Sequence, residues 1–357
     1  MSDEIRASRD GALARIVLNR PAALHALNTS MCAAMIEALM GWREDASIGA
    51  VLISHAEGTR GFCAGGDIRM LAESGAADGR EACEFFFTEY RLNHLLKTYP
   101  KPIVALIDGV TMGGGVGISV HGPFRVATER TLFAMPETGI GLFPDVGGSW
   151  FLPRLPGEVG AWLALTGARL KAADCVEAGV ATHYVPSELL GAVVAQIAGA
   201  AGAHDPSAAL SSGLDALTES AGRPKELTGE NRALIDRLFA HDRVEAIVAA
   251  LEADGSDWAK AQLETLKTKS PQTMKVALRQ VRTGAQLTDF ADAMRMEYRI
   301  GAHVVGRHDF IEGVRAVIVD KDNAPKWSPK TLEGVTDAML DEIFAPLPAA
   351  EEWTPLA

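Results

Sequence analysis

The sequence predicts an α/β protein that continues into a mostly helical C-terminal region. Strand-like runs alternate with helical patterns as far as about residue 187, which is typical of an α/β architecture. Beyond that point strand signals almost vanish and Ala, Leu, Glu and Lys predominate. We therefore expect a core over residues 1–190, which carries the functional residues, and a helical region over residues 191–357.

The individual elements follow from the period of the apolar residues. Helical spacing predicts helices over residues 29–42 and 81–99. Pro, Ser and Gly in residues 205–224 suggest a linker or a surface excursion. Short runs rich in β-branched residues and bounded by Gly or Pro predict strands, at residues 12–18, 50–55, 101–109, 124–128, 131–134 and 181–185.

Composition narrows the class of ligand. The 357 residues carry a formal charge of −12, which argues against nucleic acid or an anionic membrane as the main partner. The four cysteines show no CxxC spacing, so neither a zinc site nor a disulfide framework is indicated. The first residues lack the basic-then-apolar order of a signal peptide, and no apolar stretch is long enough to span a bilayer. These features suggest a cytoplasmic protein.

Two glycine-rich segments, GFCAGGDI (61–68) and DGVTMGGGVGISVHG (108–122), each follow a strand pattern and precede a helical one. Such turns expose backbone N–H groups, and two of them converging on one oxygen would form an oxyanion hole that stabilises a transition state by about 3–4 kcal/mol per donor. Neither segment contains GxxxxGK[ST] or GxGxxG, so nucleotide binding is disfavoured. The alternative is that the glycines serve only tight turns and close helix packing.

A third segment, MPETGIGLFPDVGG (135–148), places two acids in a loop. Glu137 and Asp145 lie among Gly and Pro and are flanked by apolar residues. Carboxylates in apolar surroundings usually have a partner or a catalytic role. The alternatives are that Glu137 is a surface-loop acid and that Asp145 caps a helix beginning near Gly148.

These three segments resemble, in order and spacing, the signature segments of the crotonase (enoyl-CoA hydratase/isomerase) superfamily. LNRPAALHALN (18–28) resembles its early coenzyme A loop, and residues 308–327 resemble its C-terminal segment. The resemblance implies a spiral of ββα turns in which the peptide N–H groups of Gly66 and Gly114 bind a thioester carbonyl oxygen. It also implies coenzyme A contacts from Leu24, Ala26, Ala64, Gly65, Gly66, Asp67 and Ile68.

The acids indicate a branch of that superfamily. Hydratases carry a second Glu three residues beyond the oxyanion glycine, where this chain has Gly117. The pair Glu137 and Asp145 instead resembles the 3-hydroxyisobutyryl-CoA hydrolase branch, which implies hydrolysis of that thioester in valine catabolism. In that branch Glu137 would be a nucleophile or a general base, Asp145 would bind the 3-hydroxyl group or steer water, and Glu89 would contact substrate.

Two other functions stay open. One is an enoyl-CoA hydratase or isomerase that acts on fatty acyl-CoA through Glu137, and the other is a non-catalytic acyl-CoA-binding protein. The resemblance implies no metal and no cofactor besides the coenzyme A of the substrate, a small-molecule partner, and self-association as a possibility.

Single residues also have simpler interpretations. Glu89 could form an ordinary helix-surface pair with Arg91. Asp67 is expected to cap the helix after the first glycine turn. Cys63 is expected to be a packing residue, because no partner base is identifiable. His25, His94 and His121 show no metal-ligand spacing and are expected to be structural.

Overall fold

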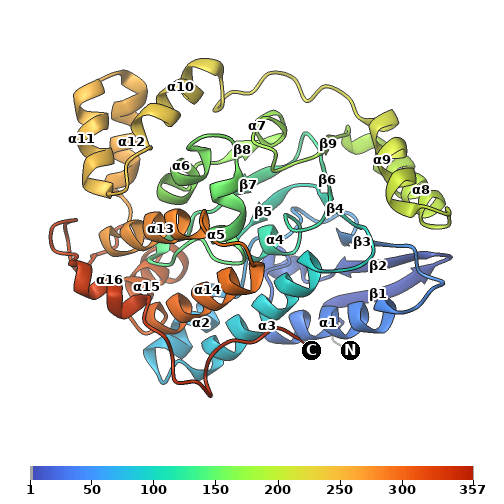
Figure 1. Cartoon of the computed structure of the whole chain (residues 1–357), viewed down its shortest axis with the longest axis horizontal. Coiled ribbons are helices and arrows are strands. Elements are labelled where there is room, and N and C mark those ends of the chain that lie inside the picture. The colour runs from blue at the N-terminus through green and yellow to red at the C-terminus, as the bar shows by residue number, and fades with distance from the viewer. Residues whose placement is uncertain (1–2, 357) are drawn as a thin grey trace. The chain divides into compact units, whose positions relative to one another are not determined.

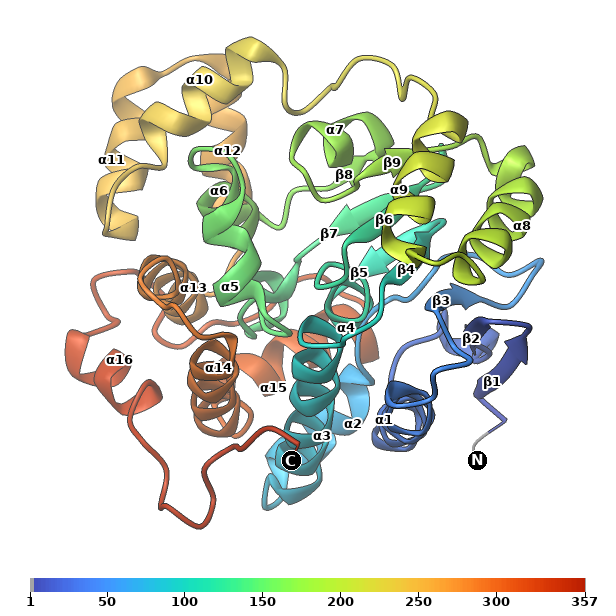
Figure 2. The same cartoon turned by 45° about the vertical axis from the view of Figure 1, so that its right-hand side comes forward.

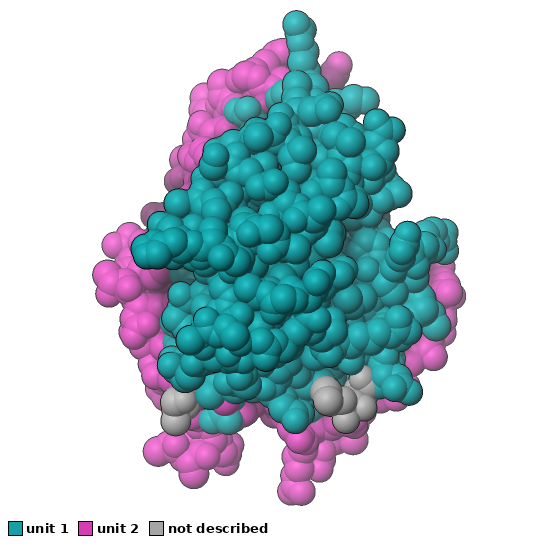
Figure 3. All heavy atoms as spheres, turned by 90° about the vertical axis from the view of Figure 1, so that its right-hand side faces the viewer, with its two compact units in different colours: residues 1–66, 91–133, 169–226 teal, residues 67–90, 134–168, 227–357 magenta. Residues whose placement is uncertain are grey.

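The computed structural model describes residues 3–356, and its internal contacts divide the chain into two units. Unit 1 comprises residues 1–66, 91–133 and 169–226, and unit 2 comprises residues 67–90, 134–168 and 227–357 (Figure 3). Each unit draws on three separate segments of the chain. The boundary near residue 190, which marks a change in element type, stays a prediction.

Unit 1 contains the strands of the α/β fold. Among the described residues they form a six-stranded sheet in the order β1-β2-β3-β4-β6-β9 and a three-stranded sheet in the order β5-β7-β8. Strands β1 and β2 pair antiparallel, and the later neighbours in the large sheet pair parallel. The strands are β1 (Ile5–Asp10), β2 (Leu13–Leu18), β3 (Ala50–His55), β4 (Ile103–Ile107), β5 (Val110–Met112), β6 (Phe124–Ala127), β7 (Leu132–Ala134), β8 (Leu170–Lys171) and β9 (His183–Tyr184).

From β4 to β7, successive strands alternate between the two sheets. Strands β4 and β6 belong to the large sheet, whereas β5 and β7 belong to the small one. The chain therefore winds as a spiral of ββα turns, as predicted. Strand β4 is buried at all five positions, which explains why its sequence IVALI is apolar throughout instead of alternating.

Helices complete unit 1. Helices α8 and α9 pack on the large sheet, where Val193, Ile197, Leu210 and Leu214 join β2, β3, β4 and β6 in one apolar cluster (Figures 1 and 2). The helices of unit 1 are α1 (Thr29–Arg43), α4 (Gly114–Gly117), α7 (Ala172–Glu177), α8 (Leu190–Ala201) and α9 (Pro206–Leu217), with short 3₁₀ turns at Pro21–Ala23 and Ser187–Leu189.

The expectation of a linker over residues 205–224 is wrong for most of that stretch, because Pro206–Leu217 is helix α9. Pro206 occupies the first helical position, where a missing N–H has no cost, and the Asp205 side chain accepts a hydrogen bond from the Ala208 amide at 3.0 Å. Leu210 and Leu214, one turn apart, supply the buried face.

Unit 2 is helical, as expected for the C-terminal region. Helix α3 (Arg80–Lys97) is divided between the units, with its residues up to Tyr90 in unit 2. The other helices of unit 2 are α2 (Ile68–Ala76), α5 (Gly148–Phe151), α6 (Val159–Thr166), α10 (Gly229–Leu238), α11 (Val244–Asp254), α12 (Asp257–Lys267), α13 (Pro271–Gly284), α14 (Phe290–Val304), α15 (His308–Val314) and α16 (Asp337–Ile343), with 3₁₀ turns η2 (Glu137–Ile140) and η3 (Leu152–Arg154) and a π-helical turn at Arg315–Val319.

Helices α13 and α14 pack against the short helix α5, and α13 also packs against η2 (Figure 1). These contacts fix the loop between η2 and α5, which carries Asp145. No helix of residues 3–356 is both long enough and apolar enough to cross a membrane.

Candidate active site

In unit 1 the first glycine turn is held between the predicted coenzyme A loop and strand β5. The Gly65 carbonyl accepts from the Leu27 amide at 2.7 Å, and the Ala64 amide donates to the Leu24 carbonyl at 3.0 Å. On the other side, Cys63 exchanges backbone hydrogen bonds with Val110 and Met112. The structure thus brings the predicted coenzyme A contacts Leu24, Ala64, Gly65 and Gly66 together on adjoining backbone.

The second glycine turn lies directly beside the first. A Cβ atom added to Gly65 would lie 4.0 Å from the Gly114 nitrogen, and Gly65 itself has a positive φ of 123°. Gly114 begins α4, so its N–H has no acceptor within that helix. A Cβ atom on the next residue, Gly115, would lie 2.3 Å from the Cys63 carbonyl oxygen, so only glycine permits this approach.

The acids of the third segment lie in unit 2. Glu137 begins η2 and is 4% exposed, so it is not a surface-loop acid. Its Oε2 atom has no hydrogen-bond partner among the described residues. Burial, and then the nearby charge of Asp145, raise the pKa of Glu137 well above its usual value, and the charge of Lys269 opposes this.

Asp145 is buried and accepts a hydrogen bond from the Tyr90 hydroxyl at 2.9 Å. Burial raises its pKa to about 7, and the Tyr90 hydrogen bond opposes that rise. Its side chain does not cap the following helix, because the α5 N-terminus has no side-chain cap within its own segment. The capping interpretation of Asp145 is therefore wrong.

Glu89 belongs to the same group of acids. It is 2% exposed, and its Oε1 atom has no partner among residues 3–356. Burial raises its pKa well above the usual value, and the charges of Asp145 and Glu297 raise it further. A solvated surface pair is thus excluded for Glu89.

Sequence reasoning missed Glu297, which is fully buried on α14. Its carboxylate accepts from the amides of Gly147 and Ser149, both at 2.8 Å, and from the Ser149 hydroxyl. Burial raises its pKa to about 8, and its hydrogen bonds oppose this. A signal was present, since an acid at position 297 shares a helical face with Met294 and Gly301.

Tyr90 was also missed as a functional residue, because its spacing fits the apolar face of α3.

We call Glu89, Glu137, Asp145 and Glu297 the carboxyl cluster. Like charges in a dry environment cannot all be ionised, so the carboxyl cluster holds protons near neutral pH. Such groups can give and take protons in general acid–base chemistry, and an ionised member can act as a nucleophile.

The remaining residues have structural roles. The Cys63 thiol donates to the His25 carbonyl at 3.1 Å and is buried, in agreement with packing. The His25 ring bonds the Arg20 amide and the Thr59 hydroxyl. Asp67 caps α2 by accepting from the Met70 amide, as predicted. No group of three or more potential metal ligands occurs among the described residues.

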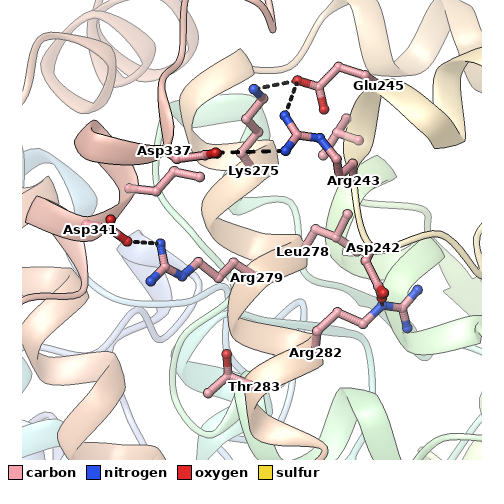
Figure 4. A pocket seen from close by; sticks show the side chains of 12 residues that line it. Asp242, Arg243, Glu245, Lys275, Leu278, Arg279, Arg282, Thr283, Asp337 and Asp341 are labelled. Carbon is pink, nitrogen blue, oxygen red and sulfur yellow. Dashed lines mark hydrogen bonds and ion pairs between the residues drawn. The ribbon is translucent and has the colours of Figure 1, made fainter.

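Unit 2 also contains a cavity of about 350 Å³ between α11, α13 and α16, outside the carboxyl cluster. Its lining is charged, but the charges pair with one another (Figure 4). Lys275 bonds Glu245 at 2.5 Å, and Arg279 bonds Asp341 at 2.8 Å. These pairs stabilise helix packing and leave no catalytic arrangement of acids.

Residues 13–344 match the family described as enoyl-CoA hydratase/isomerase. The chain belongs to this family. Its predicted superfamily and fold are thereby confirmed. The chain is also similar to a solved carnitinyl-CoA dehydratase of Mycobacterium thermoresistibile (39% identity, TM-score 0.90, 99% of each chain) and a solved enoyl-CoA hydratase of Rhodobacter sphaeroides (37% identity, TM-score 0.88, 99% of this chain and 100% of the other).

Curated relatives within the family are named 3-hydroxyisobutyryl-CoA hydrolase, mitochondrial. The Danio rerio protein is 47% identical over 96% of this chain and 90% of its own, and the Homo sapiens protein is 43% identical over 98% and 90%. The predicted resemblance to the hydrolase branch agrees with these relatives. The cytoplasmic expectation is contradicted by the mitochondrial names of these relatives. It failed because the lack of a secretory pattern does not distinguish the cytoplasm from a mitochondrion.

The packing of the two glycine turns gives a first prediction. Gly115→Ala should lower the free energy of unfolding by about 1–3 kcal/mol, because the new Cβ atom must displace the Cys63 backbone. Gly41→Ala on α1 is the control, since nothing lies within 4 Å of its added Cβ atom, and it should be neutral or slightly stabilising. Urea denaturation measures both, and equal stabilities would contradict the prediction.

The raised pKa of Asp145 gives a second prediction. The pKa of Asp145 has its ordinary value of 3.8 in the unfolded chain and is about 7 in the folded one. The folded state therefore has its full stability below pH 3.8, and part of its free energy of unfolding is lost as the pH rises to about 7. Asp145→Asn keeps an acceptor for Tyr90 but does not titrate. Its free energy of unfolding should therefore not show the decrease on the order of 3 kcal/mol that the unmodified protein shows between pH 4.5 and 7.5. Denaturation at pH 4.5 and 7.5 checks this, with Asp292→Asn on an exposed carboxylate as control.

Proposed function

We propose that this protein hydrolyses 3-hydroxyisobutyryl-CoA, a short branched 3-hydroxyacyl thioester, to 3-hydroxyisobutyrate and coenzyme A in valine catabolism. The observation that carries the proposal is the buried pair Glu137 and Asp145 in a chain that has Gly117 where a hydratase has its second Glu. Identities of 43–47% to the curated hydrolases over nearly the whole chain support it.

The proposed chemistry begins at the thioester carbonyl. A Glu137 carboxylate oxygen attacks the carbonyl carbon, and the developing oxyanion accepts hydrogen bonds from the amides of Gly66 and Gly114. The C–S bond then breaks, coenzyme A leaves and takes up a proton, and a mixed anhydride of Glu137 remains. Water opens the anhydride to give the free acid and restores the Glu137 carboxylate.

Properties within each unit support these roles. Burial leaves Glu137 Oε2 without a partner among the described residues, so its carboxylate is poorly solvated and reactive when ionised. The adjacency of Gly65 to Gly114 supports an oxyanion hole at the glycine turns. Asp145, with a pKa of about 7, is suited to bind the 3-hydroxyl group or to carry protons, and Glu89 to contact substrate.

General base catalysis by Glu137 is the alternative for the same reaction. In that case Glu137 takes a proton from water, and the water oxygen attacks the thioester directly. In both forms coenzyme A enters with the substrate, and no separate cofactor or metal takes part. Contacts with coenzyme A from residues 24, 26 and 64–68 belong to the proposal, as does self-association of the chain.

A second candidate function is hydration or isomerisation of an enoyl-CoA, because two solved structures at 37–39% identity carry hydratase or dehydratase names. The two candidates differ in their products. Purified protein with 3-hydroxyisobutyryl-CoA and a thiol reagent releases free coenzyme A if it is a hydrolase. With an enoyl-CoA as substrate, loss or movement of its double bond without thiol release would identify a hydratase or isomerase instead.

Replacement of the proposed nucleophile is the sharpest test. Glu137→Gln should lower kcat for thiol release at least about a hundredfold, because it removes the attacking or proton-accepting oxygen without changing the size of the side chain. Asp145→Gly should weaken turnover less and relax the preference for a 3-hydroxyl group. Substrate binding to Glu137→Gln is measured in parallel. Retained turnover in Glu137→Gln refutes the role. Substrate binding by the unmodified protein with neither thiol release nor a change of the double bond points to a binding protein.

The nucleophilic form makes its own prediction. Hydroxylamine added during turnover should convert the Glu137 anhydride to a hydroxamate, which mass spectrometry detects on the peptide that contains residue 137. The adduct should require substrate and should be absent from Glu137→Gln. Full turnover with no adduct would instead support general base catalysis.

A further inference from the structure

The loop that carries Asp145 has a strained backbone. Val146 has a φ of 52° and Gly147 a φ of 89°, so two successive residues lie in the left-handed region. Glycine adopts this conformation freely, but a β-branched residue such as Val146 rarely does. A strained conformation of this kind persists only where surrounding contacts hold it.

Two helices of unit 2 supply those contacts. Glu297 on α14 accepts from the amides of Gly147 and Ser149 and from the Ser149 hydroxyl. These amides lie at the start of α5, which has no capping side chain in its own segment. On α13, the Gln280 side-chain amide donates to the Pro144 carbonyl. Glu297 therefore caps a helix from a distance of about 150 residues in sequence.

Glu297 is also an ionisable neighbour of Asp145. The groups that face Asp145 are the Tyr90 hydroxyl and Glu89 on α3, Glu137 on η2 and Glu297 on α14, and Lys269 acts on Glu137. The charge of Asp145 contributes to the raised pKa of Glu297. Asp145, with a pKa of about 7 against about 8 for Glu297, ionises first, so Glu297 carries little charge while Asp145 titrates.

We propose that Glu297 is a positioning residue, which holds the strained Asp145 loop in place through the Gly147 and Ser149 donors. The inference rests on the proposed function, in which Asp145 acts on the substrate. Glu297 itself acts only through Asp145. Its loss therefore changes the geometry of the loop and, because burial and the Tyr90 hydrogen bond set the pKa of Asp145, also the pH at which Asp145 ionises, whereas a purely structural residue would change only stability.

The test compares Glu297→Gln, Ser149→Ala and the control Asp292→Asn, which changes an exposed acid on the same helix. Glutamine keeps the size of Glu297 but turns one donor toward the two amides, so at least one hydrogen bond is lost and a buried N–H is left unpaired. We expect kcat for thiol release to fall about 10- to 100-fold, which corresponds to the cost of one unpaired buried donor. Ser149→Ala removes only the hydroxyl donor and should give a smaller change in the same direction.

Two readouts do not depend on activity. Amide hydrogen exchange over residues 144–151 should become faster in Glu297→Gln and stay unchanged in Asp292→Asn. Carbon-13 NMR of the Asp145 carboxyl group, assigned by its loss in Asp145→Asn, should show a shifted titration midpoint in Glu297→Gln, because the burial of Asp145 and its hydrogen bond from Tyr90 depend on the geometry of the loop.

The outcomes separate the two proposals. Unchanged exchange and an unchanged Asp145 midpoint in Glu297→Gln overturn the role of Glu297, whatever the activity. Faster exchange and a shifted midpoint support it, even if the unmodified protein releases no thiol and the proposed function fails. If Glu297→Gln does not fold, the same two readouts in Ser149→Ala decide, with smaller shifts in support and no shift against.

Discussion

Burial of several carboxyl groups in unit 2 is the constraint on which the rest of the candidate site depends. In water Asp145 and Glu297 would be ionised at neutral pH, but removal from solvent raises their pKa values to about 7 and about 8. These values lie where a group can both release and accept a proton during turnover. The repulsion and desolvation must be offset, and the Tyr90 hydroxyl and the donors of Gly147 and Ser149 do so. The same burial that makes the acids useful also costs stability, as is common at functional sites.

The glycine turns of unit 1 meet a different requirement, which is close approach of backbone to backbone. Gly115 must lack a side chain because the Cys63 carbonyl occupies that space, whereas its neighbour Gly114 presents an N–H without an acceptor in its helix. Adjacent glycines thus combine a packing requirement at Gly115 with the proposed ligand-binding role of Gly114. The two interpretations of a glycine cluster, structural and functional, are not exclusive here, since the tight packing is what sets the orientation of the free amide.

Sequence patterns predicted the parallel strands of the large sheet because buried parallel strands carry unbroken apolar runs, as in β4 and the first four residues of β3. Strand β1 was missed because it is mostly solvent-exposed and its sequence IRASRD has no apolar run. Helix α9 was missed because its Pro and Ser residues suit both a loop and a helix start. Glu137 and Asp145 could be found from one loop, but the partner of that loop, Glu297, lies about 150 residues further along the chain. Only folding brings it there, and no local pattern records such a pairing.

The reaction must be decided by few side chains, because overall likeness does not separate the candidates. Structures at 37–39% identity carry hydratase or dehydratase names, and relatives at 43–47% identity carry a hydrolase name. Addition of water across a double bond needs one group to activate water and another to deliver a proton to carbon. Thioester hydrolysis needs attack at the carbonyl carbon and a proton for the departing sulfur. This chain has Gly117 at the position of one acid that the addition of water uses. At position 145, where a hydratase has a glycine, it has Asp145, which can carry a proton. Both differences favour attack at the carbonyl carbon, so the hydrolase is the better-supported reaction on this fold.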